Sequence, residues 1–186
     1  MEKIRCSWCE KDDLYRAYHD HEWGKPVYDD ETIFQFLVLE SFQAGLSWYT
    51  ILKKRENFKL AFDDFNYLKI AEYTAEKTEE LMQNPGIIRN RLKILATVNN
   101  AKRFLEVQKE FGTFSEYIWS FVNGKPIINH PQTLKDVPAT SEISDALAKD
   151  LKKRGFKFLG STVVYAHMQA TGMVNDHLAD CWIRNQ

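Results

Sequence analysis

The chain has 186 residues, of which 44% are hydrophobic, 27% charged and 13% aromatic. These values are typical of a globular protein, and the length predicts a single domain, 1–186, with a substantial core. The net charge of −1 excludes a uniformly basic surface, so a nucleic-acid partner must bind a local basic patch. Three cysteines argue against a disulfide framework and for a cytoplasmic location. No signal peptide is expected, because the charged N-terminus leads into no apolar run, and no membrane span is expected, because no apolar stretch approaches the required length.

Helical periodicity dominates the chain, and no convincing strand alternation is present. Apolar spacing, capping residues and turn signals predict helices over 31–44, 48–62, 77–82, 91–107, 114–122, 141–154 and 160–172, with a final turn near 176–181. No linker between predicted helices is longer than the loop 127–138. The sequence therefore predicts an all-α domain.

Two pairs of metal-ligand residues lie at opposite ends of the chain: Cys6 with His19, and His177 with Cys181. Zinc takes four such ligands in a structural site, and a His-x-x-x-Cys pair places both ligands on one face of a helical turn. The spacing alone does not decide the matter, because two isolated pairs also arise by chance. Four protein ligands would leave no open position for the water of a zinc hydrolase, and three cysteines cannot ligate a four-cysteine iron–sulfur cluster.

The segment 82–94 reads as a helix end, a glycine-bearing turn and a basic helix start. In a helix-hairpin-helix, backbone N–H groups at such a helix start bind a phosphate of DNA, with nearby cations in support. Gly86 would form the turn, and Arg89, Arg91 and Lys93 would supply the charge. A plain interhelical turn followed by a solvated basic face explains these residues equally well.

Glu40 lies on the same face of the helix predicted over 31–44 as Ile33, Phe36 and Leu37. A carboxylate on an apolar stripe is costly without a partner, and desolvation raises its pKa. One explanation is that Glu40 turns to solvent or pairs with a buried arginine. The other is that it forms the floor of a pocket for a ligand with N–H donors or positive charge.

Aromatic residues near Glu40 in this interpretation are Tyr15, Tyr18 and Trp48. Together they would form a cage suited to a flat cationic ring, such as an alkylated purine nucleoside. In a chain with this aromatic content, an ordinary hydrophobic core is the competing explanation.

Motifs over nearly the whole chain resemble, in the same order, those of the DNA-3-methyladenine glycosylase I family. The segments that carry the resemblance are Arg5–Trp8, Tyr15–Asp20, Glu22–Gly24, Leu39–Trp48, Leu52–Glu56, Gly86–Arg89, Trp119–Asn123, Leu151–Phe158 and Gly172–His177. The resemblance implies a mostly helical fold of the helix-hairpin-helix DNA glycosylase superfamily, with the termini joined by structural zinc. It also implies base-excision repair that releases free 3-methyladenine and leaves an abasic site. We expect the partner to be double-stranded DNA containing alkylated adenine, and the protein to act as a monomer.

The same resemblance assigns roles to individual residues. It places the zinc ligands at Cys6, His19, His177 and Cys181. It places recognition of the methylated adenine at Glu40, with the pocket walls at Tyr15, Tyr18 and Trp48.

An enzyme that acts on a base in DNA must first flip that base out of the stack, which costs less for a damaged base. Leu46, in the loop 43–46, is the expected wedge that fills the vacated space. A helix–helix turn packed on the core is the simpler explanation of the same loop.

Related glycosylases of the superfamily place a catalytic aspartate, sometimes with a nucleophilic lysine, after the hairpin. Here no acidic residue follows Ile94 until Glu106. We therefore expect no Schiff-base lysine and no strand cleavage. The sequence does not identify the group that assists departure of the base. Asp20 and Glu22 are acidic and near the proposed pocket, but surface solvation or capping explains them as well.

A zinc-containing DNA-binding module without catalysis is the main alternative, and it leaves Glu40 unexplained. The spacing of Cys6 and Cys9 matches a Cys-x-x-Cys zinc knuckle, but the family pattern does not use the position of Cys9, so Cys9 is expected to be a free thiol. His130 and His167 are expected to be structural, on a loop and on a helix face.

Overall fold

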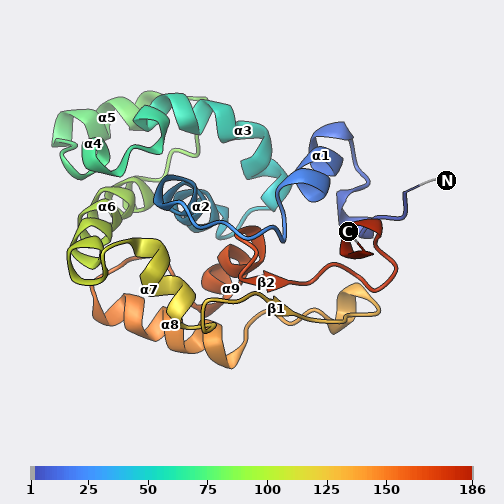
Figure 1. The fold of residues 1–186 in the computed structure, drawn as a ribbon. Coiled ribbons are helices and arrows are strands. Elements are labelled where there is room, and N and C mark those ends of the chain that lie inside the picture. The colour runs from blue at the N-terminus through green and yellow to red at the C-terminus, as the bar shows by residue number, and fades with distance from the viewer. Residues whose placement is uncertain (1–2, 186) are drawn as a thin grey trace.

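Helices make up most of the structure, a computed structural model that describes residues 3–185 (Figure 1). The α-helices are α1 (Asp13–His21), α2 (Asp30–Gln43), α3 (Trp48–Ala61), α4 (Tyr67–Ala71), α5 (Ala75–Gln83), α6 (Arg91–Phe111), α7 (Phe114–Ser120), α8 (Glu142–Lys153) and α9 (Ser161–Ala170). The short 3-10 helices are η1 (Ser7–Cys9), η2 (Asp63–Phe65), η3 (Leu134–Asp136) and η4 (Trp182–Asn185). The prediction of a mostly helical protein is confirmed.

Two short strands correct the prediction of an all-α domain. Strands β1 (Ile127–Ile128) and β2 (Val174–Asn175) pair in parallel, with Ile127 opposite Val174. Each strand has only two residues, so neither carries an alternating pattern that the sequence could reveal.

Side-chain caps fix the starts of the predicted helices. Asp29, Ser47, Asn90 and Ser141 each accept a hydrogen bond from a backbone N–H in the first turn of α2, α3, α6 and α8. Helix α1 also has such a cap, Asp12, but it was not among the predicted helices. Its buried face consists of Tyr18, His19 and Asp20, which form no apolar stripe.

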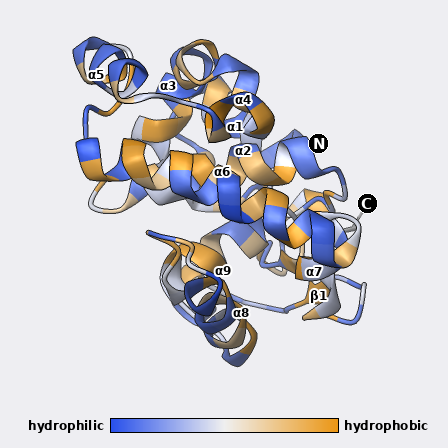
Figure 2. Cartoon of the chain, turned by 90° about the vertical axis from the view of Figure 1, so that its left-hand side faces the viewer, coloured by the Kyte–Doolittle hydropathy of each residue, from blue (hydrophilic) through white to orange (hydrophobic). Residues whose placement is uncertain are grey.

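Helix α2 lies at the centre of the fold and contacts α3, α6, α7 and α9. Its residues from Phe36 to Phe42 are all buried, so this helix has no solvent face along its second half. Helices near the outside alternate hydrophilic and hydrophobic residues, as Figure 2 shows for α6 and α8. A side chain late in α2 therefore points into protein whatever its direction.

His167 on α9 belongs to the core beside α2. It is buried, and its Nε2 donates to the carbonyl of Ile33 at 3.1 Å. Burial lowers the pKa of this histidine to about 4. Its place on a helix face, and its neutral state, fit the structural role expected for it.

The two ends of the chain lie side by side, next to α1 (Figure 1). The N–H of Trp182 donates to the carbonyl of Ile4 at 2.9 Å. Further in, Gly172 adopts a φ of +69° and lies so close to Lys25 that a Cβ atom would come within 2.2 Å of its carbonyl carbon. Glycine therefore allows the segment after α9 to pass against the segment after α1. Within residues 3–185, no helix is long and apolar enough to cross a membrane.

Candidate active site and metal cluster

A pocket of about 280 Å³ lies among α1, α2, α3 and α9. It brings together residues that are distant in the sequence and mostly aromatic or polar. The lining residues are Trp8, Tyr15, Tyr18, Trp23, Glu40, Gln43, Trp48, Leu134, Val137, Ala166, Gln169 and Asp176. The structure thus brings together the four residues that the sequence analysis grouped around a carboxylate: Glu40, Tyr15, Tyr18 and Trp48.

Glu40 lies in this pocket with only 4% of its surface exposed. Its Oε2 atom is buried and has no hydrogen-bond partner among the residues that the structure describes. Neither solvent exposure nor a hydrogen-bonded arginine accounts for that atom. Burial raises the pKa of Glu40 from 4.5 to about 8.

Aromatic side chains line the same pocket as the Glu40 carboxyl group. The ring centroids of Tyr18 and Trp48 lie 5.4 Å apart, and those of Trp8 and Tyr15 lie 4.9 Å apart. The indole Nε1 of Trp48 is buried without a partner, so the pocket holds an unused donor as well as an unused acceptor. Burial raises the pKa of Tyr15 to about 12 and that of Tyr18 well above its ordinary value, which keeps both phenols neutral.

The loop between α2 and α3 lies at the side of this pocket. Gly45 adopts a φ of +82° there, and the next residue, Leu46, is 40% exposed. Leu46 lines a smaller cavity that shares Glu40 and Gln43 with the main pocket. An apolar side chain therefore projects next to the carboxylate rather than packing fully into the core.

The segment between α5 and α6 contains the residues of the predicted hairpin. Gly86 is in the turn, where its N–H donates to the side chain of Asn84 at 2.8 Å. Arg89 and Arg91 are exposed, and Arg91 forms an ion pair with Glu79. The two arginines are thus accessible on the surface beside the start of α6.

Lys93 does not lie with these arginines. Only 6% of it is exposed, and its Nζ donates to the carbonyls of Phe42 and Ala44 at 2.9 and 2.8 Å. These carbonyls end α2, where a cation also complements the helix dipole. The expectation that Lys93 contacts phosphate is therefore corrected: its face of α6 packs against α2, and its charge stabilises the loop that carries Leu46.

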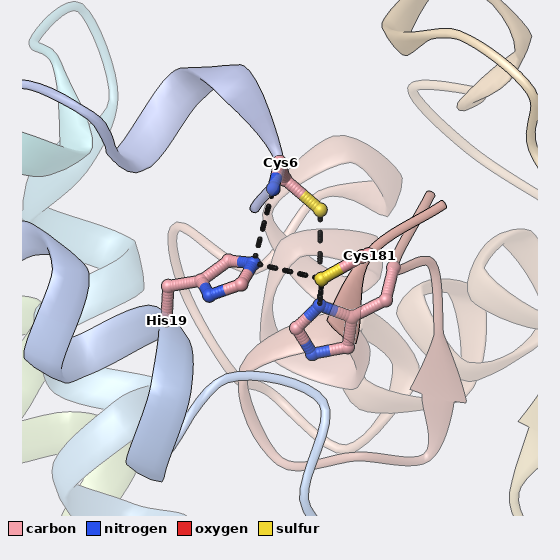
Figure 3. A group of neighbouring side chains, drawn as sticks. Cys6, His19 and Cys181 are labelled. Carbon is pink, nitrogen blue, oxygen red and sulfur yellow. Dashed lines mark hydrogen bonds between the residues drawn. The ribbon is translucent and has the colours of Figure 1, made fainter. Parts of the chain in front are cut away.

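The four Cys and His residues from the two chain ends form a second, fully buried cluster. The ligand atoms of Cys6, His19, His177 and Cys181 all lie within 4.8 Å of one another (Figure 3). The sulfur of Cys181 is 3.5 Å from a ring nitrogen of each histidine, and that of Cys6 is 3.7 Å from His177 Nδ1. Tetrahedral zinc with Zn–S of about 2.3 Å and Zn–N of about 2.0–2.1 Å separates sulfur and nitrogen by about 3.6 Å. The donor set and its spacing therefore fit a structural metal ion.

Of the two acidic residues considered near the pocket, Asp20 and Glu22, neither lines it, and only Asp20 supports this cluster. Asp20 accepts from His19 Nδ1 at 2.8 Å and from Arg5 at 2.9–3.1 Å. Burial disfavours its ionised form, but the hydrogen bonds from Arg5 and His19 lower the pKa of Asp20 to about 2. A carboxylate that orients a ligating histidine in this way is common at zinc sites. Glu22 instead pairs with Arg55 at 2.6 Å.

The backbone around the ligands and the third cysteine of the chain complete the description of this cluster. His177 and Cys181 do not lie on a helical turn as their spacing predicted; the chain is irregular there, with a turn at Ala179–Asp180. Cys9 is a free thiol, as expected, and its Sγ donates to the carbonyl of Cys6 at 3.1 Å.

Pocket residues that the sequence analysis did not single out include Trp8, Trp23, Gln169 and Asp176. Trp8 and Trp23 pack on each other with centroids 5.0 Å apart, and Asp176 has 1% of its surface exposed. The only local sign of a site was that Asp176 is next to His177.

Comparison with known proteins identifies the family. The methyladenine glycosylase profile matches residues 8–185. The chain belongs to the methyladenine glycosylase family. Over 177 residues it is 51% identical to the DNA-3-methyladenine glycosylase of Haemophilus influenzae, covering 95% of this chain and 96% of that protein. It is 48% identical to the DNA-3-methyladenine glycosylase 1 of Escherichia coli, with 95% of each chain covered.

Solved structures agree with this assignment. The fold matches that of a variant of 3-methyladenine DNA glycosylase I in complex with 3-methyladenine, with a TM-score of 0.94 and 42% identity. The match covers 98% of both chains. The glycosylase fold expected from the sequence motifs is thus confirmed over nearly the whole length.

Proposed function

We propose that this protein is a DNA glycosylase of base-excision repair that hydrolyses the N-glycosidic bond of 3-methyladenine in alkylated DNA. The observation that carries the proposal is the buried carboxyl group of Glu40, whose Oε2 has no partner within a pocket walled by aromatic rings. Identities of 51% and 48% to two DNA-3-methyladenine glycosylases over 95% of the chain support the same activity.

Methylation at N3 makes the purine nucleoside cationic and weakens its glycosidic bond. Glu40 would accept a hydrogen bond from the exocyclic amino group or the adjacent ring edge, while Tyr15, Tyr18 and Trp48 stack around the base. A ligand that donates to Glu40 also stabilises its ionised form, which lets the group release its proton on binding. Unmodified adenine lacks the positive charge, so the pocket would discriminate by electrostatics as well as by shape.

DNA would bind on the side where the Leu46 loop and the start of α6 meet the surface. The phosphate backbone would contact Gly86, Arg89 and Arg91 in the manner of a helix-hairpin-helix. To do so, Arg91 would give up its ion pair with Glu79 and bind a phosphate instead. Leu46, which is exposed beside the pocket, would fill the space left by the flipped base. Double-stranded DNA containing alkylated adenine is the proposed substrate, bound by one copy of the chain.

We propose zinc as the metal of the four-ligand cluster. When bound there, the ion would cross-link the chain ends and supply no open position for a substrate. His19 follows Tyr18 directly in α1, so holding this histidine also holds one wall of the pocket. The free thiols of this cluster suit a reducing compartment, and we propose the cytoplasm.

Hydrolysis would proceed without a covalent enzyme intermediate. Lys93, which follows the predicted hairpin, is buried with its amine donating to two carbonyl groups, so it is not free to form a Schiff base. We therefore propose a monofunctional enzyme that leaves an abasic site and an intact strand.

The test is release of free base from methylated duplex DNA by the native protein and by Glu40→Gln. The proposal expects 3-methyladenine from the native protein, no cut strand, and a loss of about tenfold or more in the variant, because a hydrogen bond to a charged acceptor is replaced. A native protein that binds the duplex but releases no base would instead be a DNA-binding module.

A further inference from the structure

A second carboxylate lines the same pocket. Asp176, which follows β2, has 1% of its surface exposed and borders the pocket together with Gln169 and Glu40. Thr162 and Ala166 of α9 line the small cavity beside Leu46, whereas Gln169, farther along that helix, donates to Asp176. Asp176 thus lines the main pocket but not the small cavity beside Leu46.

Three hydrogen bonds hold the carboxyl group of Asp176 in a fixed position. Its Oδ1 accepts from the amide of Asn129 at 2.7 Å, and its Oδ2 accepts from the hydroxyl of Tyr165 at 2.7 Å and the amide of Gln169 at 2.8 Å. All three groups donate to Asp176, as an ionised carboxylate requires. Among residues 3–185, no lysine or arginine forms an ion pair with it, although buried charges are normally paired.

The two carboxyl groups of the pocket thus differ in their hydrogen-bond partners. Glu40 has an unused oxygen and no donor to stabilise its charge, which suits a direct hydrogen bond to a ligand. Asp176 has its oxygens occupied by three neutral donors, which suits a fixed negative charge that acts over a distance.

We propose that Asp176 is a specificity-determining residue, whose fixed charge draws positively charged alkylated purines into the pocket in preference to neutral ones. The inference rests on the proposed function, because it concerns the charge of the same substrate. Neutral adenine gains little from the carboxylate, whereas an N3-methylated nucleoside carries a full positive charge into a pocket whose two carboxyl residues are buried.

Binding of two small probes at one pH tests the inference. The first is 3,9-dimethyladeninium, a permanent cation that resembles the substrate base with its N9 substituent. The second is 3-methyladenine in its neutral form. Asp176→Asn should weaken binding of the cation about tenfold or more and binding of the neutral base less than about twofold.

Tyr165→Phe is the matched control, because it removes one hydrogen bond of the same group and leaves the charge of Asp176 in place. It should keep the preference for the cation. If both variants weaken both probes equally, Asp176 is only a structural residue and the inference is overturned.

Glu40→Gln provides a second measurement if Asp176→Asn does not fold. This variant should bind both probes less tightly yet still prefer the cation, because Asp176 remains. A loss of the preference in Glu40→Gln would assign it to Glu40 and overturn the inference.

The native protein separates this inference from the proposed function. A native protein that binds neither probe and releases no base from methylated DNA contradicts the proposed function. One that releases 3-methyladenine but binds both probes equally well contradicts only the role of Asp176.

Discussion

Glu40→Gln should stabilise the protein increasingly as the pH rises, while removing activity. The pKa of the buried carboxyl group is about 8 in the folded chain and 4.5 ordinarily. Because the folded pKa is the higher one, stability is greatest below pH 4.5 and is lost as the pH rises through 8. The pKa of Glu40 rises by about 3.5 on folding, and each pKa unit corresponds to roughly 1.4 kcal/mol, so ionisation of Glu40 can lower the free energy of unfolding by at most about 5 kcal/mol. Glutamine cannot ionise and avoids this loss.

Urea unfolding of both proteins at pH 5.5 and 8.5 measures the effect. The advantage of the glutamine variant should grow by about 3 kcal/mol between these pH values, which is the part of the linkage that falls in this interval. Glu31→Gln is a matched control, because it changes an exposed glutamate in the first turn of the same helix and should show no such growth. Stability differences that stay constant with pH would refute the account of Glu40 as an unpartnered buried carboxyl group.

Three other predictions concern the metal, the DNA surface and the core. Cys181→Ser should lose a bound zinc ion and lower the melting temperature by roughly 10 °C, as a loss of about 3 kcal/mol does for a chain of this size; an unchanged metal content and melting curve would contradict it. Arg89→Ala should reduce the slope of log K for DNA against log salt by about one, whereas Lys93→Met should leave that slope unchanged and cost about 2 kcal/mol of stability in urea titrations. Because the pKa of His167 is lowered to about 4, the free energy of unfolding of the native chain should fall by roughly 3 kcal/mol more than that of His167→Gln between pH 6.5 and 4. Urea unfolding at both pH values measures this, and a stability difference that does not change with pH would contradict it.

The sequence predicts most helices well because their starts are local features. Residues such as Ser47 and Asn90 cap the helix that follows within three residues, so the boundary is contained in a short window. Helix α1 escapes this reasoning, since its buried face includes His19 and Asp20, whose burial depends on Arg5 and on Cys181 at the other end of the chain.

In the site, too, the residues with a local sequence signal are predicted, and those whose role depends on distant segments are not. Glu40 stands out in the sequence because a carboxylate interrupts an apolar face, and that face is buried as predicted. Lys93 is misassigned because its partners Phe42 and Ala44 lie about 50 residues away, and a lysine at a helix start otherwise predicts a solvent-exposed charge. Apart from its place next to His177, Asp176 has no local signal, since its donors lie on α9 (Tyr165 and Gln169) and beside β1 (Asn129), which meet it only in the folded protein.

The meeting of the two chain ends has a consequence for synthesis. Cys6 and His19 emerge from the ribosome first, but they cannot complete a four-ligand set until Cys181 has also emerged. Helix α1, which carries Tyr15 and Tyr18, is joined to that set through His19. A nascent chain can therefore pack α2 against α3 and α6 early and still lack a finished base pocket. A product that stops short of residue 181 would therefore lack one ligand of this set and the contact of Cys181 with His19.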